Sequence, residues 1–373
     1  MTTARSQPAG LLRAARASDW PGAALVLAAA AIVVGLIDVV AVPVLLREQA
    51  TDWRAYEGAA QLMAQGSSPY VWTVDPDVRA VTDYPYIYPP PLAAIWGLGL
   101  NAPLFAALKV VSLATMIAFV RVASPTPTRP LVLAAGVALA GITLASAGVV
   151  HDLILGNVRT LYVAAVALVL AMPRSAWAGA PLGALVAIAL KPAIAPFLVW
   201  MLLRRRSQFI AAFAAGLATT GLFAVFLGPG VFVDYLVALP KLGGLAQPFT
   251  GNLGLSSFSL ALAVVAIPLS ILWVVVAARL FDPWASAAVA VGMTFLAQPT
   301  LGLNYAGLLA PGIVALWLVD RRAAFTMAVA LPVASIVSPP LAGVILALVA
   351  TWAGWRARTR AGESPMTDRM SAA

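Results

Sequence analysis

Long apolar stretches, separated by short polar segments, follow one another along the chain from Gly22 to Trp355. A helix needs about 20 apolar residues to cross a bilayer, so this pattern predicts about ten crossings by α-helices. Prolines divide several of the stretches, and because proline breaks a helix, some segments should span only half of the bilayer. We therefore predict an all-α, polytopic membrane protein of about 10–12 spanning or half-spanning helices.

The polar segments divide the chain into one membrane domain and two cytoplasmic ends. We expect a cytoplasmic N-terminal segment over residues 1–21, a polytopic domain over 22–357 and a disordered cytoplasmic tail over 358–373. The first span leads into an external loop over residues 47–89, which holds three arginines and six acidic residues and so carries a net charge of −3. This loop is therefore expected on the side away from the basic segments. The same distribution of charges predicts spans over residues 22–46 and 130–150 and a second external loop over residues 228–257. Two short segments around Ser338-Pro339-Pro340 are expected to return the chain to the cytoplasm.

The composition narrows the class of protein further. Hydrophobic residues make up 62% of the 373 residues and charged residues only 10%, against about 25% charge in a soluble domain. A soluble globular protein and a disordered one are therefore excluded. The chain has no cysteine, which excludes disulfides, thiolate metal sites and a cysteine nucleophile. It has a single histidine, and we expect neither a metal ion nor a cofactor.

The net charge is +9, a value that in a soluble protein would suggest a nucleic-acid partner. Here the arginines stand in short clusters at the ends of apolar stretches, as in Arg204 to Arg206 and in Arg321-Arg322. This distribution is typical of the cytoplasmic loops of membrane proteins. It predicts a multi-pass protein of the cell membrane, surrounded by lipid, with both termini in the cytoplasm and no nucleic-acid partner.

The apolar block over residues 179–203 contains Lys191-Pro192 near its middle. A single crossing here would place Arg204 to Arg206 outside, against the distribution of the other arginines. Proline breaks a helix and disfavours helix at the preceding residue, so we predict two half-helices, over 179–190 and 193–203, in a hairpin with Lys191 at its tip. A lysine within an apolar block is by default a functional residue, and its ammonium suits a phosphate. The alternative is a lysine that extends to the membrane surface.

Unusual polar residues fall between the predicted spans on the external side, and this asymmetry predicts a site on that face. They are Asp52, His151, Asp152, Asn157, Lys191, Asn252, Gln298 and Asn304. His151 could act as a pH-sensitive acid or base, or it could be a solvated loop residue.

Residues 52–63 have the periodicity of an amphipathic helix that lies at the membrane surface. Positions 52, 56, 59, 60 and 63 share one face, with Asp52 at the N-terminal end and Tyr56 one turn later. Asp52 could cap this helix. It could instead serve as a general base that takes a proton from an attacking hydroxyl.

Three tyrosines stand among prolines just before the chain re-enters the predicted membrane, in Tyr84-Pro85-Tyr86-Ile87-Tyr88-Pro89. Tyrosine at this depth commonly anchors a chain at the membrane surface. Tyr86 and Tyr88 could instead form a wall that faces a sugar or a prenyl chain, because an aromatic ring offers a flat apolar surface with a polar group. A short half-spanning helix is expected to follow, up to residue 100.

In their order and spacing, these motifs resemble the GT-C class of polyprenyl-phosphate-sugar-dependent glycosyltransferases. In particular they resemble glycosyltransferase family 87, which includes actinobacterial mannosyltransferases. The residues that carry the resemblance are Asp52 with Tyr56, Ala59 and Ala60, Gly66 with Pro69-Tyr70, Tyr86 with Tyr88-Pro89-Pro90, Gly156-Asn157, Gly183 through Leu190-Lys191-Pro192 with Arg204 to Arg206 at its end, and Asn252 with Ser256-Ser257. The resemblance extends over most of the chain.

The resemblance implies a GT-C-like fold and an inverting hexosyltransferase that acts on the external face. Its donor would be polyprenyl-phosphate mannose and its acceptor a cell-envelope glycolipid or glycan, with Asp52 as general base and Lys191 as a ligand of the donor phosphate. The other substrate-binding residues would be Tyr56, Tyr86, Tyr88, His151, Asn157, Asn252 and Asn304. Where the family often has a Trp and His motif at the start of a late span, this chain reads Gln298-Pro299-Thr300-Leu301-Gly302-Leu303-Asn304-Tyr305, so that Asn304, Tyr305 or His151 would substitute.

The alternative function is a polytopic transporter or flippase for a lipid-linked or small polar substrate, which would also have broken helices and an intramembrane cation. Transporters usually consist of two related halves. This sequence has no evident internal repeat, and its unusual polar residues gather on one face. The transferase is therefore the favoured hypothesis.

Overall fold

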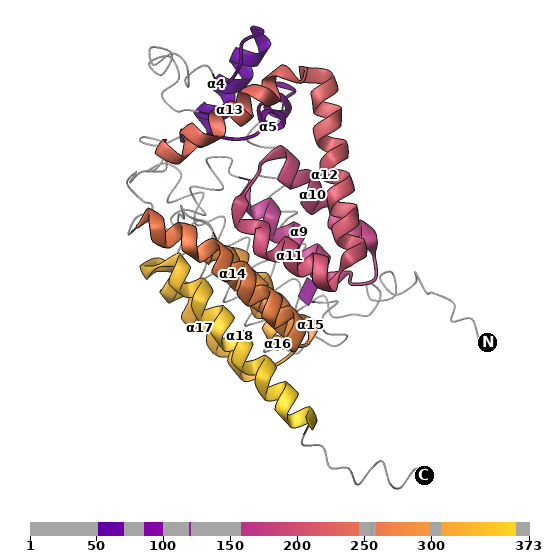
Figure 1. Cartoon of the computed structure of the whole chain (residues 1–373), viewed down its shortest axis with the longest axis vertical. Coiled ribbons are helices and arrows are strands. Elements are labelled where there is room, and N and C mark those ends of the chain that lie inside the picture. The colour runs from indigo at the N-terminus through magenta and orange to yellow at the C-terminus, as the bar shows by residue number, and fades with distance from the viewer. Residues whose placement is uncertain are drawn as a thin grey trace, which may run out of the picture.

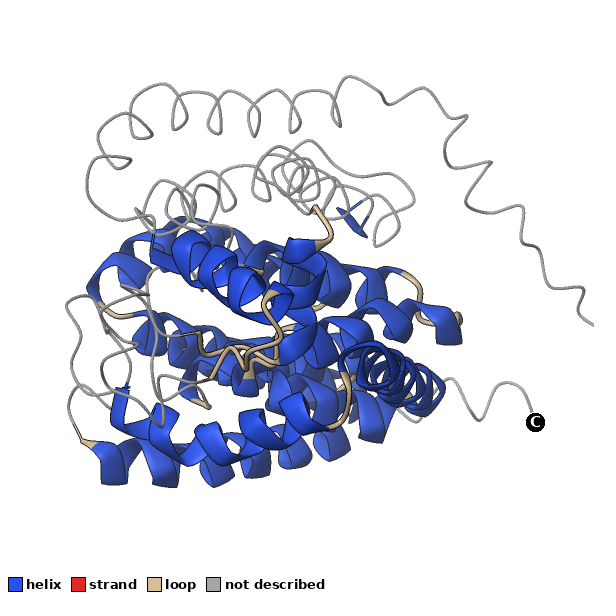
Figure 2. Ribbon diagram, turned by 90° about the horizontal axis from the view of Figure 1, so that it is seen from above, coloured by secondary structure: helices blue, strands red, loops and turns tan. Residues whose placement is uncertain are grey.

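The structure, a computed structural model, describes residues 51–70, 86–99, 119–120, 158–245, 255, 259–297 and 307–362. Every regular element in these ranges is a helix (Figures 1 and 2). The all-α fold class is therefore confirmed for the described part of the chain. The predicted spans over residues 22–46 and 130–150 lie outside these ranges.

The helices are joined mostly by short connections. In chain order they are α4 (Thr51–Ala64), α5 (Pro90–Gly97), α9 (Arg159–Ala171), the 3-10 helix η3 (Ala176–Gly179), α10 (Ala180–Ile188), the 3-10 helix η4 (Pro192–Ile194), α11 (Ala195–Arg204), α12 (Arg206–Leu227), α13 (Gly230–Leu245), α14 (Leu260–Leu280), α15 (Pro283–Leu296), α16 (Leu309–Trp317), α17 (Arg321–Val337) and α18 (Pro339–Gly362). Figure 1 shows α14 to α18 as a bundle at the lower left, α9 to α12 beside it, and α4, α5 and α13 at the upper end.

Helix α4 is the amphipathic helix that the periodicity predicts. Its predicted face is buried at Tyr56, Ala59 and Ala60, whereas Glu57 on the opposite face is exposed. The buried face packs against α5. Helix α5 starts with two prolines, which its first turn tolerates because the N–H groups there have no helical partner. The short helix predicted at this point is confirmed.

The predicted break at Lys191 is present between α10 and α11. A Cβ atom built on Gly179, just before α10, would come 2.0 Å from the carbonyl oxygen of Gln208 in the first turn of α12. Helix α11 ends at Arg204, directly before α12. The N-terminal end of α10 and the C-terminal end of α11 therefore both lie beside the start of α12. Lys191 stands at the turn between the two helices, away from that end. This is the hairpin that the sequence predicts.

Two expectations for the second half of the chain are wrong. Residues 228–257 were expected to be an external loop, but α13 occupies much of this range, because Tyr235 and Ala238 on one face of the helix become buried. The chain around Pro339 was expected to form two short segments, but α17 and α18 have 17 and 24 residues. The prolines stand in the first turn of α18, where they start a helix instead of interrupting one. Helix α18 also continues past the expected domain boundary at residue 358.

Glycines let two pairs of helices approach closely. A Cβ atom on Gly183 of α10 would lie 1.7 Å from the carbonyl oxygen of Ala212 on α12. In the same way, a Cβ atom on Gly292 of α15 would lie 2.5 Å from the carbonyl oxygen of Gly343 on α18. A Cβ atom on Gly343 would lie 2.5 Å from the carbonyl oxygen of Gly292. Small residues at helix crossings are typical of membrane proteins, where close backbone packing replaces the hydrophobic effect.

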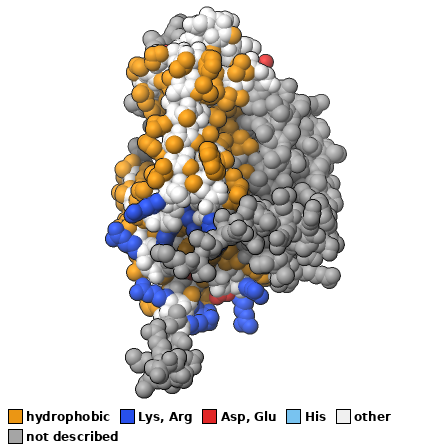
Figure 3. All heavy atoms as spheres, turned by 90° about the vertical axis from the view of Figure 1, so that its right-hand side faces the viewer, with side chains coloured by type: hydrophobic (Ala, Val, Ile, Leu, Met, Phe, Trp, Pro, Cys, Tyr) orange, Lys and Arg blue, Asp and Glu red, His pale blue; other side chains and the backbone are white. Residues whose placement is uncertain are grey.

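Two helices of the described part, α12 and residues Pro339–Arg360 of α18, are long and apolar enough to cross a membrane. Only 6% of the apolar window of α12 is buried. Its exposed side chains include Ile210, Phe213 and Leu217. Figure 3 shows hydrophobic side chains along this side of the molecule. A large exposed apolar surface suits lipid better than water. The finding supports membrane association, while the number of crossings and the sides of the two termini stay predictions.

Several arginines lie at the end of the molecule where α12 begins. The side chain of Gln208 donates hydrogen bonds to carbonyls on both sides of Arg174. Arg204 donates through Nη2 to the carbonyl of Phe281, close to Arg279 in the chain. These contacts bring the ends of α9, α11 and α14 together.

The end of α18 joins the same group of arginines. Gly354 lies against Phe281, just before the arginines of the last turns of α18. Helices α17 and α18 pack against each other and are separated by Ser338 alone, so the start of α17 lies near the end of α18. Figure 3 shows the basic side chains gathered below the apolar surface. We call this the basic end, and its described members are Arg174, Arg204, Arg205, Arg206, Arg279, Arg321, Arg322, Arg356, Arg358 and Arg360.

Candidate functional site

The side chain of Lys191, at the turn of the hairpin, contacts Tyr88 in the segment before α5. Its Nζ atom donates a hydrogen bond of 3.0 Å to the Tyr88 hydroxyl and lies 4.2 Å from the centroid of the Tyr88 ring. Lys191 is only 8% exposed. A hydroxyl oxygen and an aromatic face both stabilise a cation that is removed from water. Two segments that are 103 residues apart in the sequence therefore meet at one place.

Tyr56 of α4 belongs to the same cluster. Its ring centroid lies 5.2 Å from that of Tyr88, with the two planes at 76°. It also lies 6.3 Å from the centroid of Tyr86 and 5.3 Å from that of Trp96 in α5. Edge-to-face contacts of this kind favour a defined ring arrangement. The structure therefore brings together Tyr56, Tyr86, Tyr88 and Lys191. The sequence predicts these residues as candidates from separate motifs.

Tyrosine hydroxyls hold the backbone of this segment. Tyr70 donates a hydrogen bond of 2.6 Å to the carbonyl oxygen of Tyr88. Tyr86 donates one of 2.6 Å to the carbonyl oxygen of Pro89 and accepts one of 3.0 Å from the N–H of Ala93. These bonds shape the turn into α5 and so determine where Tyr88 stands.

Burial keeps the phenol groups of Tyr70, Tyr86 and Tyr235 protonated. It is the main cause that raises the pKa of Tyr70 and of Tyr86 well above the ordinary value. Burial also raises the pKa of Tyr235, on α13, to about 12. The ring of Tyr235 lies 5.5 Å from that of Tyr70. At neutral pH these three groups are therefore protonated and do not act as bases. Sequence reasoning missed Tyr235 because it stands in a segment that was expected to be a loop.

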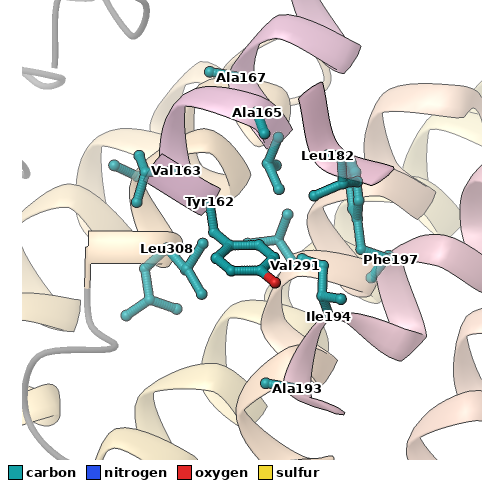
Figure 4. Close-up of a cluster of buried hydrophobic side chains, with 14 of the residues drawn as sticks. Tyr162, Val163, Ala165, Ala167, Leu182, Ala193, Ile194, Phe197, Val291 and Leu308 are labelled. Atoms are coloured by element: carbon teal, nitrogen blue, oxygen red, sulfur yellow. The ribbon is translucent and has the colours of Figure 1, made fainter. Parts of the chain in front are cut away.

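Tyr162 of α9 holds the end of α10, and sequence reasoning missed it as well. Its hydroxyl lies 3.0 Å from the carbonyl oxygen of Ala189 and 3.2 Å from that of Leu185, to which it donates. The last carbonyl groups of a helix lack a backbone N–H partner within the helix, and the Tyr162 hydroxyl takes the place of that donor. Figure 4 shows the ring of Tyr162 within a cluster of apolar side chains, with Ile194 close by. Tyr162 therefore fixes the backbone just before Lys191. A tyrosine within an apolar helix carries no pattern that would reveal this role.

Of the remaining candidate residues, the structure describes only the backbone position of residue 52. Position 52 stands in the first turn of α4, and the helical register puts it on the face that carries Tyr56, one turn away. The other four candidates, His151, Asn157, Asn252 and Asn304, lie outside the described residues.

The described site holds a buried cation beside aromatic rings. Within the described ranges, no group of three or more His, Cys, Asp or Glu side chains is close enough to hold a metal ion. The ammonium of Lys191 has three donors, which match the oxygens of a phosphate. The aromatic rings around it offer flat apolar surface beside that charge.

Comparisons of the chain with protein-family models, with curated proteins and with solved structures gave no match. The function is therefore inferred from the residues of the site.

Proposed function

We propose that this protein is a membrane hexosyltransferase that moves a mannosyl residue from a polyprenyl-phosphate donor to a cell-envelope glycolipid or glycan. The observation that carries the proposal is the contact of Lys191 with Tyr88, beside the ring of Tyr56. A donor phosphate needs a cation, and a sugar or a prenyl chain packs well on aromatic rings. The juxtaposition of these groups supports a polyprenyl-phosphate sugar as the donor.

Asp52 is the proposed general base. A hydroxyl of the acceptor attacks the anomeric carbon of the donor sugar, and Asp52 takes the hydroxyl proton as the new C–O bond forms. The bond from the anomeric carbon to the phosphate oxygen breaks, and its electron pair leaves with polyprenyl phosphate. Because attack comes from the side opposite the phosphate, the anomeric configuration inverts. The charge of Lys191 stabilises the leaving phosphate. The register of α4, with position 52 one turn from Tyr56, supports this assignment.

The basic end is proposed to face the cytoplasm, because clusters of arginine mark cytoplasmic loops. Helices α10 and α11 have 9 and 10 residues, which puts Lys191 about 14 Å from the basic end at 1.5 Å per residue. Helix α12 has 22 residues and extends for about 33 Å. Lys191 would then lie within the thickness of the membrane, on the external side of the half-helices. A lipid-linked donor can reach such a place from the bilayer.

The test compares the purified wild-type protein with Asp52→Asn and with Glu57→Gln, a control that removes an exposed carboxylate from the same helix. Each is incubated with polyprenyl-phosphate mannose and a pool of mannoside acceptors, and the products are measured by mass spectrometry. We expect the wild type and Glu57→Gln to release polyprenyl phosphate and to form a product heavier by one hexose. Folded Asp52→Asn should do neither, and normal turnover by it would remove Asp52 from the mechanism.

A variant of Lys191 separates the transferase from the alternative function. In the same assay, Lys191→Gln should raise KM for the donor and leave KM for the acceptor nearly unchanged, because only the donor carries the phosphate. The same proteins are placed in vesicles that hold the lipid-linked sugar in one leaflet. Movement of that lipid between leaflets by the wild type, without transfer of the sugar, would establish a flippase and refute the transferase.

A further inference from the structure

Arg204 and Arg205 form a second cationic site, at the opposite end of the hairpin from Lys191. Arg204 is the last residue of α11, Arg205 joins α11 to α12, and both are half-buried. The Cζ atom of Arg205 lies 5.9 Å from the centroid of the Trp200 ring, and Arg204 donates through Nη2 to the carbonyl of Phe281. The Nε atoms of both arginines are hidden from water and have no acceptor in the described part of the chain. An unsatisfied buried donor is costly, so the pair favours an additional acceptor.

Two acidic side chains of the described part of the chain cap helices and form no ion pair with these arginines. The carboxylate of Asp282 accepts hydrogen bonds from N–H groups at the start of α15, and that of Asp320 accepts them at the start of α17. No ion pair of the described residues neutralises Arg204 or Arg205. Burial, and then the charge of Arg204, lower the pKa of Arg205. The exposed Arg206 adds a further positive charge next to the pair.

We propose that Arg204 and Arg205 bind the phosphate group of an anionic phospholipid. A guanidinium group presents a planar fork of N–H donors that fits two phosphate oxygens. The exposed apolar surface of α12 starts within two turns of the pair, with Ile210 64% exposed and Phe213 62% exposed. Figure 3 shows the hydrophobic side chains along this side of the molecule. The acyl chains of a lipid held at the arginines would lie along this surface. Inorganic phosphate has the same charged group but would leave the apolar surface unused.

The site is independent of the proposed transferase activity, and its test needs only binding. The full-length protein is purified in an uncharged detergent and titrated with phosphatidylglycerol, phosphatidylcholine or inorganic phosphate. The readouts are the melting temperature and the lipid retained in native mass spectrometry. We expect phosphatidylglycerol to raise the melting temperature and to remain bound, and the other two probes to do neither.

Paired substitutions locate the binding at this site. Arg204→Gln/Arg205→Gln should need about 10-fold more phosphatidylglycerol for the same shift, because charge-assisted hydrogen bonds are lost. Arg358→Gln/Arg360→Gln removes the same charge from exposed positions on α18 and should change the requirement by no more than about twofold. Equal weakening in both variants would overturn the proposal, since overall charge would then explain the binding. Undiminished binding by the first variant would overturn it too.

Two further outcomes are decisive. A shift with inorganic phosphate as large as that with phosphatidylglycerol would overturn a lipid as the ligand, even if Arg204→Gln/Arg205→Gln abolished it. If that variant does not fold, Arg204→Lys/Arg205→Lys retains the charge and removes the planar fork. It should weaken the binding of phosphatidylglycerol about threefold or more, and unchanged binding would overturn the proposal.

Discussion

Substituting Gly183 by alanine tests whether the half-helix hairpin is held through direct backbone contact with α12. A Cβ atom at this position would come 1.7 Å from the carbonyl oxygen of Ala212 and 2.7 Å from its Cα atom. Both are backbone atoms and cannot rotate aside as the end of a side chain can. The added methyl group therefore has to push α10 and α12 apart.

The size of the effect follows from this geometry. A Cβ atom reaches ordinary contact at 3.4 Å, so α10 has to retreat by about 1.7 Å from the carbonyl oxygen of Ala212. Overpacking that shifts a backbone costs about 3 kcal/mol at the upper end of its usual range, and separation also weakens the dispersion contacts along the crossing. Alanine recovers up to about 1 kcal/mol as a better helix former than glycine. We expect Gly183→Ala to lower the free energy of unfolding by about 2 kcal/mol.

The assay is thermal unfolding of the detergent-purified variants, with Gly221→Ala as the matched control. Gly221 lies within α12, and a Cβ atom there meets nothing within 4 Å. The control should be neutral, or more stable by up to about 1 kcal/mol. If Gly183→Ala unfolds at the same temperature as Gly221→Ala, the backbone contact is absent and the account of the hairpin packing is wrong.

Three other outcomes are expected. Gln208→Leu should destabilise the protein by about 2 kcal/mol, because the buried Nε2 atom that bridges three carbonyls is lost, and chemical denaturation measures this. Trp200→Phe should cost about 1 kcal/mol through the lost 3.0 Å hydrogen bond to Ser286, and a double-mutant cycle with Ser286→Ala isolates that bond. The melting temperature should fall as the pH rises from the ordinary tyrosine pKa of 10 toward 12. The pKa of Tyr235 in the folded protein is about 12, so above pH 10 the unfolded state loses this proton first.

Each of these expectations has a result that contradicts it. Full stability of Gln208→Leu would mean that the three carbonyls have other donors. A coupling energy near zero between Trp200 and Ser286 would show that the bond contributes nothing. Tyr235→Phe should retain more of its stability above pH 10 than the wild type, and an identical loss in both proteins would show that other groups cause the alkaline effect.

Several elements of the site were predictable from the sequence because they depend on neighbouring residues only. The break at Lys191-Pro192 and the start of α5 follow from the effect of proline on the adjacent backbone. The buried face of α4 follows from the helical period of its apolar positions. Helix α13 was not predictable in this way, because glycines and prolines at its ends resemble those of a loop, whereas Tyr235 is buried against Tyr70.

By itself, the sequence determined the helical class and the half-helix hairpin. It also indicated Tyr56, Tyr88 and Lys191 as candidate site residues, each from a separate motif. Only the tertiary structure decided that these three residues meet, that Tyr162 fixes the end of α10, and that Arg204 lies against the end of α14. Such contacts join segments distant in the chain and depend on how closely helices pack. How closely two helices pack depends on the size and shape of single residues at their crossing. The hydrophobic pattern of the sequence does not contain this information.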